Sequence, residues 1–296
     1  MGSANLVLAH TFEQLKGALE AGPRTVVMTM GALHQGHLDL VRAAQGEGGQ
    51  VVVTIFVNPL QFGPGEDYER YPRTLEADLA ALAQANADGI GRRMAVYAPS
   101  PGDMYPQGRP AVTVRAGALG ERFEGAVRPG HFDGVLTVVL KLLRRTGAAA
   151  AVFGLKDAQQ LAAIRRMNAD LDLGVKIIAV PTRREADGLA LSSRNAYLSP
   201  LQRRAALALP QAIAAGAAAA GAGADPAEIR QVARAAMGRL PQPELPEYLD
   251  LVDPATFAPV PAGWVGPAWL IGAFQAGPAR LIDNAAVVVG AAGVGA

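Results

Sequence analysis

Residues 25–37, with the sequence TVVMTMGALHQGH, decide the fold class of this chain. The first six, Thr25–Met30, are mostly β-branched and apolar residues of the kind that form a buried strand. Gly31 and two histidines, His34 and His37, come next, and an apolar helical pattern follows them. A strand that runs through a glycine turn into a helix is the first half of a βαβ unit, so this stretch predicts an α/β protein.

Strands and helices keep alternating on the carboxyl side of this stretch. Residues 50–57 are almost wholly apolar, which indicates a strand that is buried on both faces. Further strands are expected at 95–97, 149–153 and 175–180, and helices at 134–145, at 157–170 and after a capping Thr74. This order predicts an α/β fold with a doubly wound, Rossmann-like parallel sheet, which binds its ligands at the carboxyl ends of the strands.

The character of the chain changes near Asp187. An alanine-rich helix is expected over residues 201–220, and a second helix begins at Asp225 and Pro226. Three later segments, at 247–252, 269–274 and 280–289, predict the strands of a small antiparallel sheet. We therefore expect a Rossmann-like domain over residues 1–184 and a smaller α+β domain over residues 185–296.

The composition excludes several classes of protein. The 296 residues carry a net charge of +1 with both signs scattered, and no basic stripe suggests a nucleic-acid partner. No apolar run approaches the roughly 18–20 residues that span a bilayer, and the N-terminus lacks the pattern of a signal peptide. There is no cysteine, which excludes disulfides and zinc sites built on thiolates. These features favour a cytoplasmic enzyme with no membrane partner.

The two histidines after the first quoted strand are the strongest chemical signal. At the start of a helix, free backbone amides and the helix dipole attract phosphate. Imidazole N–H groups on that first turn can donate to a triphosphate and stabilise charge that develops on it. Two polar loop residues or a metal pair would give the same pattern, although zinc is disfavoured because His10 and His131 are the only further histidines.

A second signal is the run Leu191-Ser192-Ser193-Arg194-Asn195. Two hydroxyls and an arginine on a loop can close over phosphate oxygens. Such runs also occur as solvated turns. This one follows the last predicted strand of the parallel sheet, which makes it the natural partner of the histidine turn.

Residues 28–37 and 191–195 together resemble the phosphate-binding pair of the HIGH-type nucleotidyltransferase superfamily. Further segments are similar to one family within it, the pantothenate synthetases or pantoate–β-alanine ligases. They are TIFVNPLQF at 54–62, YPRT at 71–74, RPGHFDGV at 128–135 with TVV at 137–139, FGLKDAQQ at 153–160, and RLIDN at 280–284. These motifs occur in the family's order along most of the chain.

The resemblance implies an AMP-forming ligase that joins pantoate to β-alanine with ATP through a pantoyl-adenylate intermediate. It also implies Mg²⁺ accompanying ATP, a homodimer, nucleotide and pantoate binding by residues 1–184, and a lid formed by residues 185–296 that carries the Ser-Ser-Arg-Asn loop. The alternative is an adenylyltransferase of the same superfamily that acts on a phosphorylated acceptor. Such an enzyme would need neither Gln61 and Gln160 nor a separate C-terminal domain.

The resemblance also implies a role for individual residues. The expected catalytic residues are His34, His37, Lys156 and Arg194. The expected ATP contacts are Met30 through its amide, His34, His37, Gly154, Lys156, Asp157, Ser192, Ser193 and Arg194. Pantoate is expected to meet Gln61, Gln160, Val138, Val139 and Phe153, and β-alanine to meet Asn58, Tyr71 and Arg194. Asp78 is the expected metal residue, because Ala77 and Ala81 stand at neighbouring positions of its helix and cannot serve. His131 is expected to order a neighbouring loop.

Overall fold

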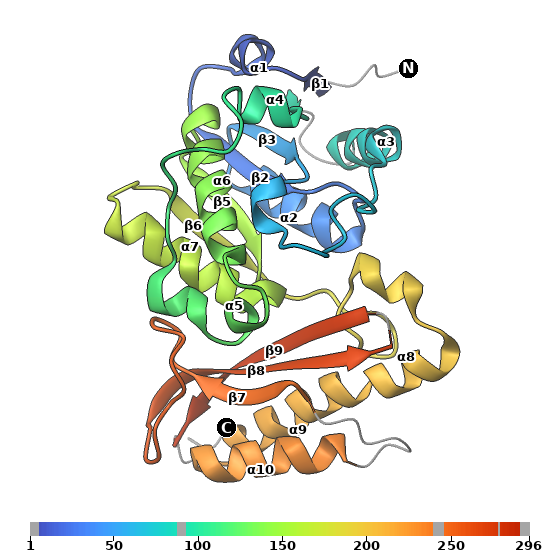
Figure 1. The fold of residues 1–296 in the computed structure, drawn as a ribbon, viewed down its shortest axis with the longest axis vertical. Helices are drawn as coiled ribbons and strands as arrows, with labels where there is room; N and C mark the ends of the chain where they lie inside the picture. The colour runs from blue at the N-terminus through green and yellow to red at the C-terminus, as the bar shows by residue number, and fades with distance from the viewer. Residues whose placement is uncertain (1–5, 88–92, 239–245, 278, 291–296) are drawn as a thin grey trace. The chain divides into compact units, whose positions relative to one another are not determined.

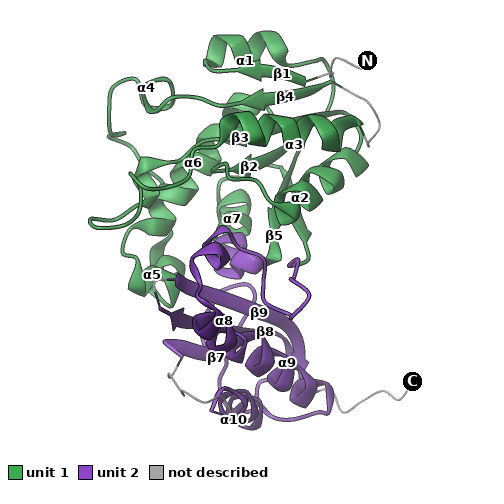
Figure 2. Cartoon of the chain, turned by 90° about the vertical axis from the view of Figure 1, so that its right-hand side faces the viewer, with its two compact units in different colours: residues 1–155, 163–181 green, residues 156–162, 182–296 purple. Residues whose placement is uncertain are grey.

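The computed structural model describes residues 6–87, 93–238, 246–277 and 279–290, which form two sheets with their helices (Figure 1). The chain divides into two compact units (Figure 2). The first unit comprises Met1–Leu155 and Ala163–Pro181, and the second comprises Lys156–Ala162 and Thr182–Ala296. From Thr182 onward the chain belongs to the second unit, and the expected boundary lies after residue 184. The earlier segment Lys156–Ala162 also belongs to the second unit.

A six-stranded parallel sheet forms the centre of the first unit. Its strands are β1 (Leu6–Ala9), β2 (Arg24–Thr29), β3 (Gln50–Ile55), β4 (Met94–Tyr97), β5 (Ala150–Gly154) and β6 (Lys176–Val180). They lie in the order β1-β4-β3-β2-β5-β6, and every pairing is parallel. The strand order reverses between β2 and β5, and in doubly wound sheets ligands bind outside the carboxyl ends of the strands at such a reversal. The histidine turn follows β2, so the predicted fold class is confirmed together with the position of this motif.

Helices cover both faces of this sheet. On one face, Val27 and Val53 of the strands join Leu38 of α2 and Leu82 of α3 in a single apolar cluster. On the other face α6 packs against β2, and α1 packs against β4 and α6 (Figure 2). The helical segments up to residue 170 are α1 (Phe12–Ala18), α2 (Gln35–Gly46), η1 (Pro59–Gln61), α3 (Leu75–Ala87), α4 (Pro101–Met104), η2 (Gly117–Glu121), α5 (Glu124–Val127), α6 (His131–Thr146), η3 (Leu155–Asp157) and α7 (Ala158–Asp170).

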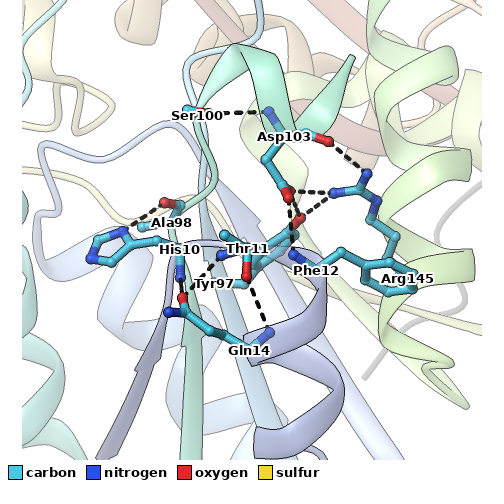
Figure 3. A network of polar contacts seen from close by, with 9 residues as sticks. All are labelled: His10, Thr11, Phe12, Gln14, Tyr97, Ala98, Ser100, Asp103 and Arg145. Carbon is cyan, nitrogen blue, oxygen red and sulfur yellow. Dashed lines mark hydrogen bonds and ion pairs between the residues drawn. The ribbon is translucent and has the colours of Figure 1, made fainter. Parts of the chain in front are cut away.

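A polar network ties α1, α4 and α6 to the end of β4 (Figure 3). Asp103 is its centre: it accepts from the Tyr97 hydroxyl at 2.5 Å, from Arg145 Nη1 at 2.7 Å and from the Phe12 amide at 3.0 Å. Burial raises the pKa of Tyr97, so its hydroxyl stays protonated and donates. Three side chains and one backbone amide, which come from four separate elements, are thereby fixed at one point of the first unit.

The second unit is built on a three-stranded antiparallel sheet in the order β7-β8-β9, covered by α9 and α10. Its core contains Leu209 and Ile213 of α9 with Leu249, Leu270 and Phe274 of the strands. The elements are η4 (Ser193–Tyr197), α8 (Pro200–Ala206), α9 (Ala208–Gly221), α10 (Pro226–Met237), β7 (Tyr248–Val252), β8 (Gly266–Ala276) and β9 (Ala279–Val289). The small antiparallel sheet expected from the sequence is confirmed.

The single helix expected over residues 201–220 is wrong, because this segment forms two helices. One ends at Ala206 and the next begins at Ala208. Pro210 explains the break: it has no amide hydrogen to donate to the carbonyl of Ala206, and its ring would clash with that carbonyl in a continuous helix.

Candidate active site

The turn between β2 and α2 is held by a buried carboxylate. Asp78 of α3 is only 2% exposed. Its Oδ2 accepts from the Ala32 amide at 3.1 Å, and its Oδ1 accepts from the Leu33 amide at 2.8 Å and from the Thr74 hydroxyl at 3.3 Å. Gly31 and Ala32 have φ values of 86° and 51°, and this left-handed conformation is strained for alanine. The carboxylate therefore stabilises a turn that is unfavourable by itself.

His34 and His37 come together at the N-terminus of α2. Their rings stack with a centroid distance of 4.0 Å and an interplanar angle of 27°. The His34 amide lies 3.3 Å from His37 Nδ1 and donates to it. Because an amide can only donate, this nitrogen carries no proton, and the proton of the neutral ring lies on Nε2. His37 can therefore donate through Nε2 beside the helix N-terminus.

Asp78 does not have the geometry of a resident metal ligand. Both of its oxygens accept from protein donors, and its side chain is buried. Within the described part of the chain, no three histidine, aspartate or glutamate side chains gather in a set that could hold a metal ion. These residues do not fit a Mg²⁺ site built by the protein itself.

Gln61 lies in η1, directly after β3, and its side chain and backbone are both held. Its Oε1 accepts from Asn58 Nδ2 at 3.1 Å, and its Nε2 lies 3.1 Å from Met30 Sδ. Its backbone carbonyl is 2.8 Å from His131 Nδ1 and also accepts from Arg128 at 3.3 Å. His131 thus orders the η1 turn, as expected.

The remaining expected site residues of the first unit lie on three separate elements. Val138 and Val139 are buried in α6, and Phe153 is buried near the end of β5. Gly154 is the last residue of β5, at the edge where the strand order reverses. Tyr71 lies in the segment between η1 and α3, and its ring centroid is 6.0 Å from that of Phe62.

The other expected site residues belong to the second unit. Lys156 and Asp157 lie in η3, and Gln160 lies in the first turn of α7. Asn284 of β9 donates from Nδ2 to the Lys156 carbonyl at 2.8 Å. Strand β9 therefore holds the η3 turn that carries Lys156.

The loop with Ser192, Ser193 and Arg194 is fixed by polar contacts within the same unit. The Arg194 amide donates to Ser192 Oγ at 3.3 Å, and η4 packs against β9. Upstream of the loop, Arg184 makes two hydrogen bonds to Asp283 of β9, at 2.6 and 2.9 Å. Asp283 thus anchors the segment upstream of the loop, and its neighbour Asn284 anchors the lysine turn.

Sequence reasoning assigned no role to Asp283, Asn284 or Tyr105. The first two had a visible signal, because they interrupt the apolar pattern of a predicted strand with two polar residues. Tyr105 had none, since a tyrosine in a loop is common and its partner Asn58 is distant in the sequence.

Comparison with known proteins identifies the family. A family model described as pantoate-beta-alanine ligase matches residues 8–286. The chain belongs to the pantoate-beta-alanine ligase family. Pantothenate synthetase from Streptomyces avermitilis is 47% identical over 334 residues, which cover 96% of this chain and 98% of that protein.

Solved structures of pantoate-beta-alanine ligases share the fold. The crystal structure of pantothenate synthetase from Thermus thermophilus has a TM-score of 0.86 and 46% identity, and the match covers 94% of this chain and 98% of that one. Pantoate-beta-alanine ligase from Francisella tularensis, complexed with beta-gamma ATP and β-alanine, has a TM-score of 0.73 and 31% identity, with 95% and 97% coverage.

The pantoate-beta-alanine ligase match decides between the two functions that the sequence left open. It includes Gln61 and Gln160 as well as most of the small sheet, which an adenylyltransferase would not need.

No helix among the described residues is long and apolar enough to cross a membrane.

Proposed function

We propose that this protein is a ligase that condenses pantoate with β-alanine to give pantothenate, while ATP is converted to AMP and pyrophosphate. The observation that carries the proposal is the family match over residues 8–286, which includes every residue expected at the site. A relative with 31% identity has been crystallised with beta-gamma ATP and β-alanine, which supports the same two ligands here.

The reaction has two steps. A carboxylate oxygen of pantoate attacks the α-phosphorus of ATP, and the bond from that phosphorus to the bridging oxygen of pyrophosphate breaks. The amine of β-alanine then attacks the acyl carbon of the pantoyl adenylate, loses its proton, and displaces AMP. Negative charge spreads over the phosphoryl oxygens in the first step, so preorganised donors around them accelerate it.

His34 and His37 are proposed to bind phosphate in the first unit. The N-terminus of α2 supplies backbone amides and the positive end of the helix dipole, which favour an anion there. The hydrogen bond from the His34 amide to His37 Nδ1 leaves the proton of the neutral ring on Nε2, and we propose that Nε2 donates it to a phosphoryl oxygen. We assign an ATP contact to the Met30 amide as well, and a ribose contact to Gly154 with Asp157.

Lys156 and Arg194 are the cations that we assign to the phosphates from the second unit. Asn284 holds the Lys156 turn, and the loop of Ser192 and Ser193 presents Arg194 with two hydroxyls. Because the backbone at both residues is held before ATP binds, we propose that their ammonium and guanidinium groups neutralise the transition-state charge with little reorganisation. Arg194 is also proposed to meet β-alanine, together with Tyr71.

Pantoate is proposed to bind Gln61 and Gln160, with Val138, Val139 and Phe153 against its gem-dimethyl group. All three side chains are apolar, which supports this assignment, because contact between apolar groups of ligand and protein removes both from water. Mg²⁺ is proposed to enter with ATP as part of the substrate, with phosphate oxygens and water as its ligands. The homodimer and the cytoplasmic location remain predictions.

Product analysis tests the proposal. The protein is incubated with ATP, Mg²⁺, pantoate and β-alanine, and the products are identified by mass spectrometry. AMP and pyrophosphate should form together, and only when pantoate is present. ADP and phosphate would instead indicate an acyl-phosphate mechanism and refute the adenylate.

Lys156→Ala tests the assignment of the lysine. Removing a preorganised donor to the transition state should lower pantoyl-adenylate formation by about 10²-fold or more, while the unfolding transition stays unchanged. Lys176→Ala is the matched control, because Lys176 is an exposed lysine whose ion pair with Glu47 contributes little. Equal rates for the two variants would contradict the role of Lys156.

A further inference from the structure

A chain of hydrogen bonds runs through the first unit from Tyr105 to Met30. The Tyr105 hydroxyl lies 2.8 Å from Asn58 Oδ1. Asn58 Nδ2 lies 3.1 Å from Gln61 Oε1, and Gln61 Nε2 lies 3.1 Å from Met30 Sδ. Asn58 is 1% exposed and Gln61 is 9% exposed, so the chain is shielded from water along most of its length.

The Asn58 side chain has no hydrogen-bonding capacity left for a ligand. Its Oδ1 accepts from the Leu60 amide at 3.3 Å and from the Tyr105 hydroxyl. Its Nδ2 donates to Gln61 Oε1 and, at 3.1 Å, to the Gly134 carbonyl. A primary amide offers two acceptor positions and two donor hydrogens, and all four are used within the protein.

Two backbone groups fix which atom donates and which accepts in each of these hydrogen bonds. The Leu60 amide can only donate and the Gly134 carbonyl can only accept, so the amide of Asn58 has one possible orientation. Asn58 Nδ2 consequently faces Gln61, which must turn its Oε1 toward it. Burial raises the pKa of Tyr105, so its hydroxyl stays protonated and donates to the remaining acceptor position.

At the Met30 end of this series of hydrogen bonds, the donor is an N–H group with a poor acceptor. Gln61 Nε2 faces the thioether sulfur of Met30, which is a weak acceptor. A carboxylate or hydroxyl oxygen is a much better acceptor, and a hydrogen bond to a charged oxygen is about twice as strong as one between neutral groups. A ligand with such an oxygen can therefore replace the sulfur at little cost.

We infer that Asn58, oriented by Leu60 and Gly134 and completed by Tyr105, is a positioning residue that fixes Gln61 as a one-way N–H donor to the acid substrate. The acid must then bring an acceptor oxygen to this point, and a group that can only donate is rejected. This inference rests on the proposed function, and it gives Asn58 a different task from the β-alanine contact expected from the family resemblance.

The pantoate-dependent exchange of pyrophosphate into ATP separates these roles, because the exchange needs no β-alanine. If Asn58 positions Gln61, Asn58→Asp should raise the KM for pantoate in the exchange by about tenfold or more, since a carboxylate cannot donate to Gln61 Oε1. The KM for ATP should change little. Normal exchange with a defect confined to the β-alanine step would overturn the inference.

Two substitutions of Gln61 test the direction of its hydrogen bond. Gln61→Glu keeps the shape and places an acceptor where the N–H stood, so it should repel the acid and exchange more slowly than Gln61→Ala. A glutamine that only supports the fold, or that accepts from pantoate, would give the opposite order. Glutamate equal to or faster than alanine therefore refutes the one-way donor.

Tyr105→Phe keeps the inference testable if Asn58→Asp does not fold, because it removes one hydroxyl and leaves the aromatic ring in place. It should raise the KM for pantoate severalfold with the KM for ATP and the melting temperature nearly unchanged, and an unchanged pantoate KM would contradict the role of Tyr105. Wild-type protein is measured in parallel. Absence of exchange in the wild type would refute the proposed function itself, whereas exchange in the wild type with the wrong order of variants would refute only this inference.

Discussion

Gly134→Ala should disable the pantoate step by displacing η1. A Cβ atom on Gly134 would stand 2.2 Å from the Leu60 carbonyl oxygen, 2.5 Å from its carbon and 2.7 Å from the Gln61 amide nitrogen. Contacts below 3.0 Å essentially never occur for real Cβ atoms. The obstructing atoms are backbone, so no side-chain rotation relieves the clash, and α6 and η1 must move apart.

The size of the movement follows from these contacts. Carbon and oxygen atoms reach favourable contact at roughly 3.5 Å, so the two elements must separate by about 1 Å. The hydrogen bonds from Asn58 to the Gly134 carbonyl and from His131 to the Gln61 carbonyl cross this same boundary. A displacement of about 1 Å costs on the order of 10²-fold in rate, and overpacking of this kind costs about 1–3 kcal/mol in stability.

The assay is kcat/KM for pantoate in the pyrophosphate exchange, together with the free energy of unfolding from urea denaturation. Gly46→Ala is the matched control, because Gly46 also lies in a helix but an added Cβ there meets nothing within 4 Å. The control should keep full activity and gain about 0.5–1 kcal/mol of stability. A Gly134→Ala variant with wild-type kcat/KM for pantoate would refute the proposed link between this contact and Gln61.

Two further predictions concern carboxylates of the first unit. Asp78→Asn leaves either the Ala32 or the Leu33 amide without an acceptor, so the rate of adenylate formation should fall by about 10²-fold. The Mg²⁺ concentration for half-maximal activity should stay unchanged. A shift of that concentration would instead indicate that Asp78 is a metal ligand. For Glu66, the hydrogen bond from Arg128 lowers the pKa below its usual 4.5. The stabilisation from this pair is therefore complete above pH 4.5 and is lost as the pH falls through the folded-state pKa. Glu66→Gln should lower the free energy of unfolding by about 1 kcal/mol at pH 7 after allowance for solvent screening. The difference in unfolding free energy between variant and wild type should become smaller as the pH falls. A difference that does not change with pH would contradict the assignment of this ion pair.

Much of the fold could be predicted because the inner strands of the parallel sheet, β2, β3, β4 and β5, are mostly buried. The apolar run at 50–57 shows this best, since five of the six residues of β3 are buried and no other class of strand needs so continuous a pattern. By contrast, β1 has four residues, Leu6–Ala9, and is recognisable only through its pairing with β4. A segment of that length has too few residues to show a period.

The motif residues of the candidate site could be found from the sequence, but their supports could not. Asp78 lies 45 residues from Leu33, and Asn58 lies 76 residues from Gly134. Such contacts depend on how the elements pack, which no local pattern encodes. Lys156 shows the same limit. Its position directly after β5 predicted that it belongs to the unit with the parallel sheet, whereas Lys156–Ala162 groups with the unit that contains Thr182–Ala296.

The hydrogen bond between Asn284 and Lys156 also sets an order of events during synthesis. It joins residues 128 positions apart, and ribosomes add about 5–20 residues per second, so the partner of the lysine turn is made roughly 6–25 s after the turn itself. Until β9 has left the ribosome, the backbone of Lys156 lacks the contact that fixes it. A nascent chain therefore cannot complete its proposed catalytic lysine turn before β9 exists, and chains that stop short of β9 are not expected to consume ATP.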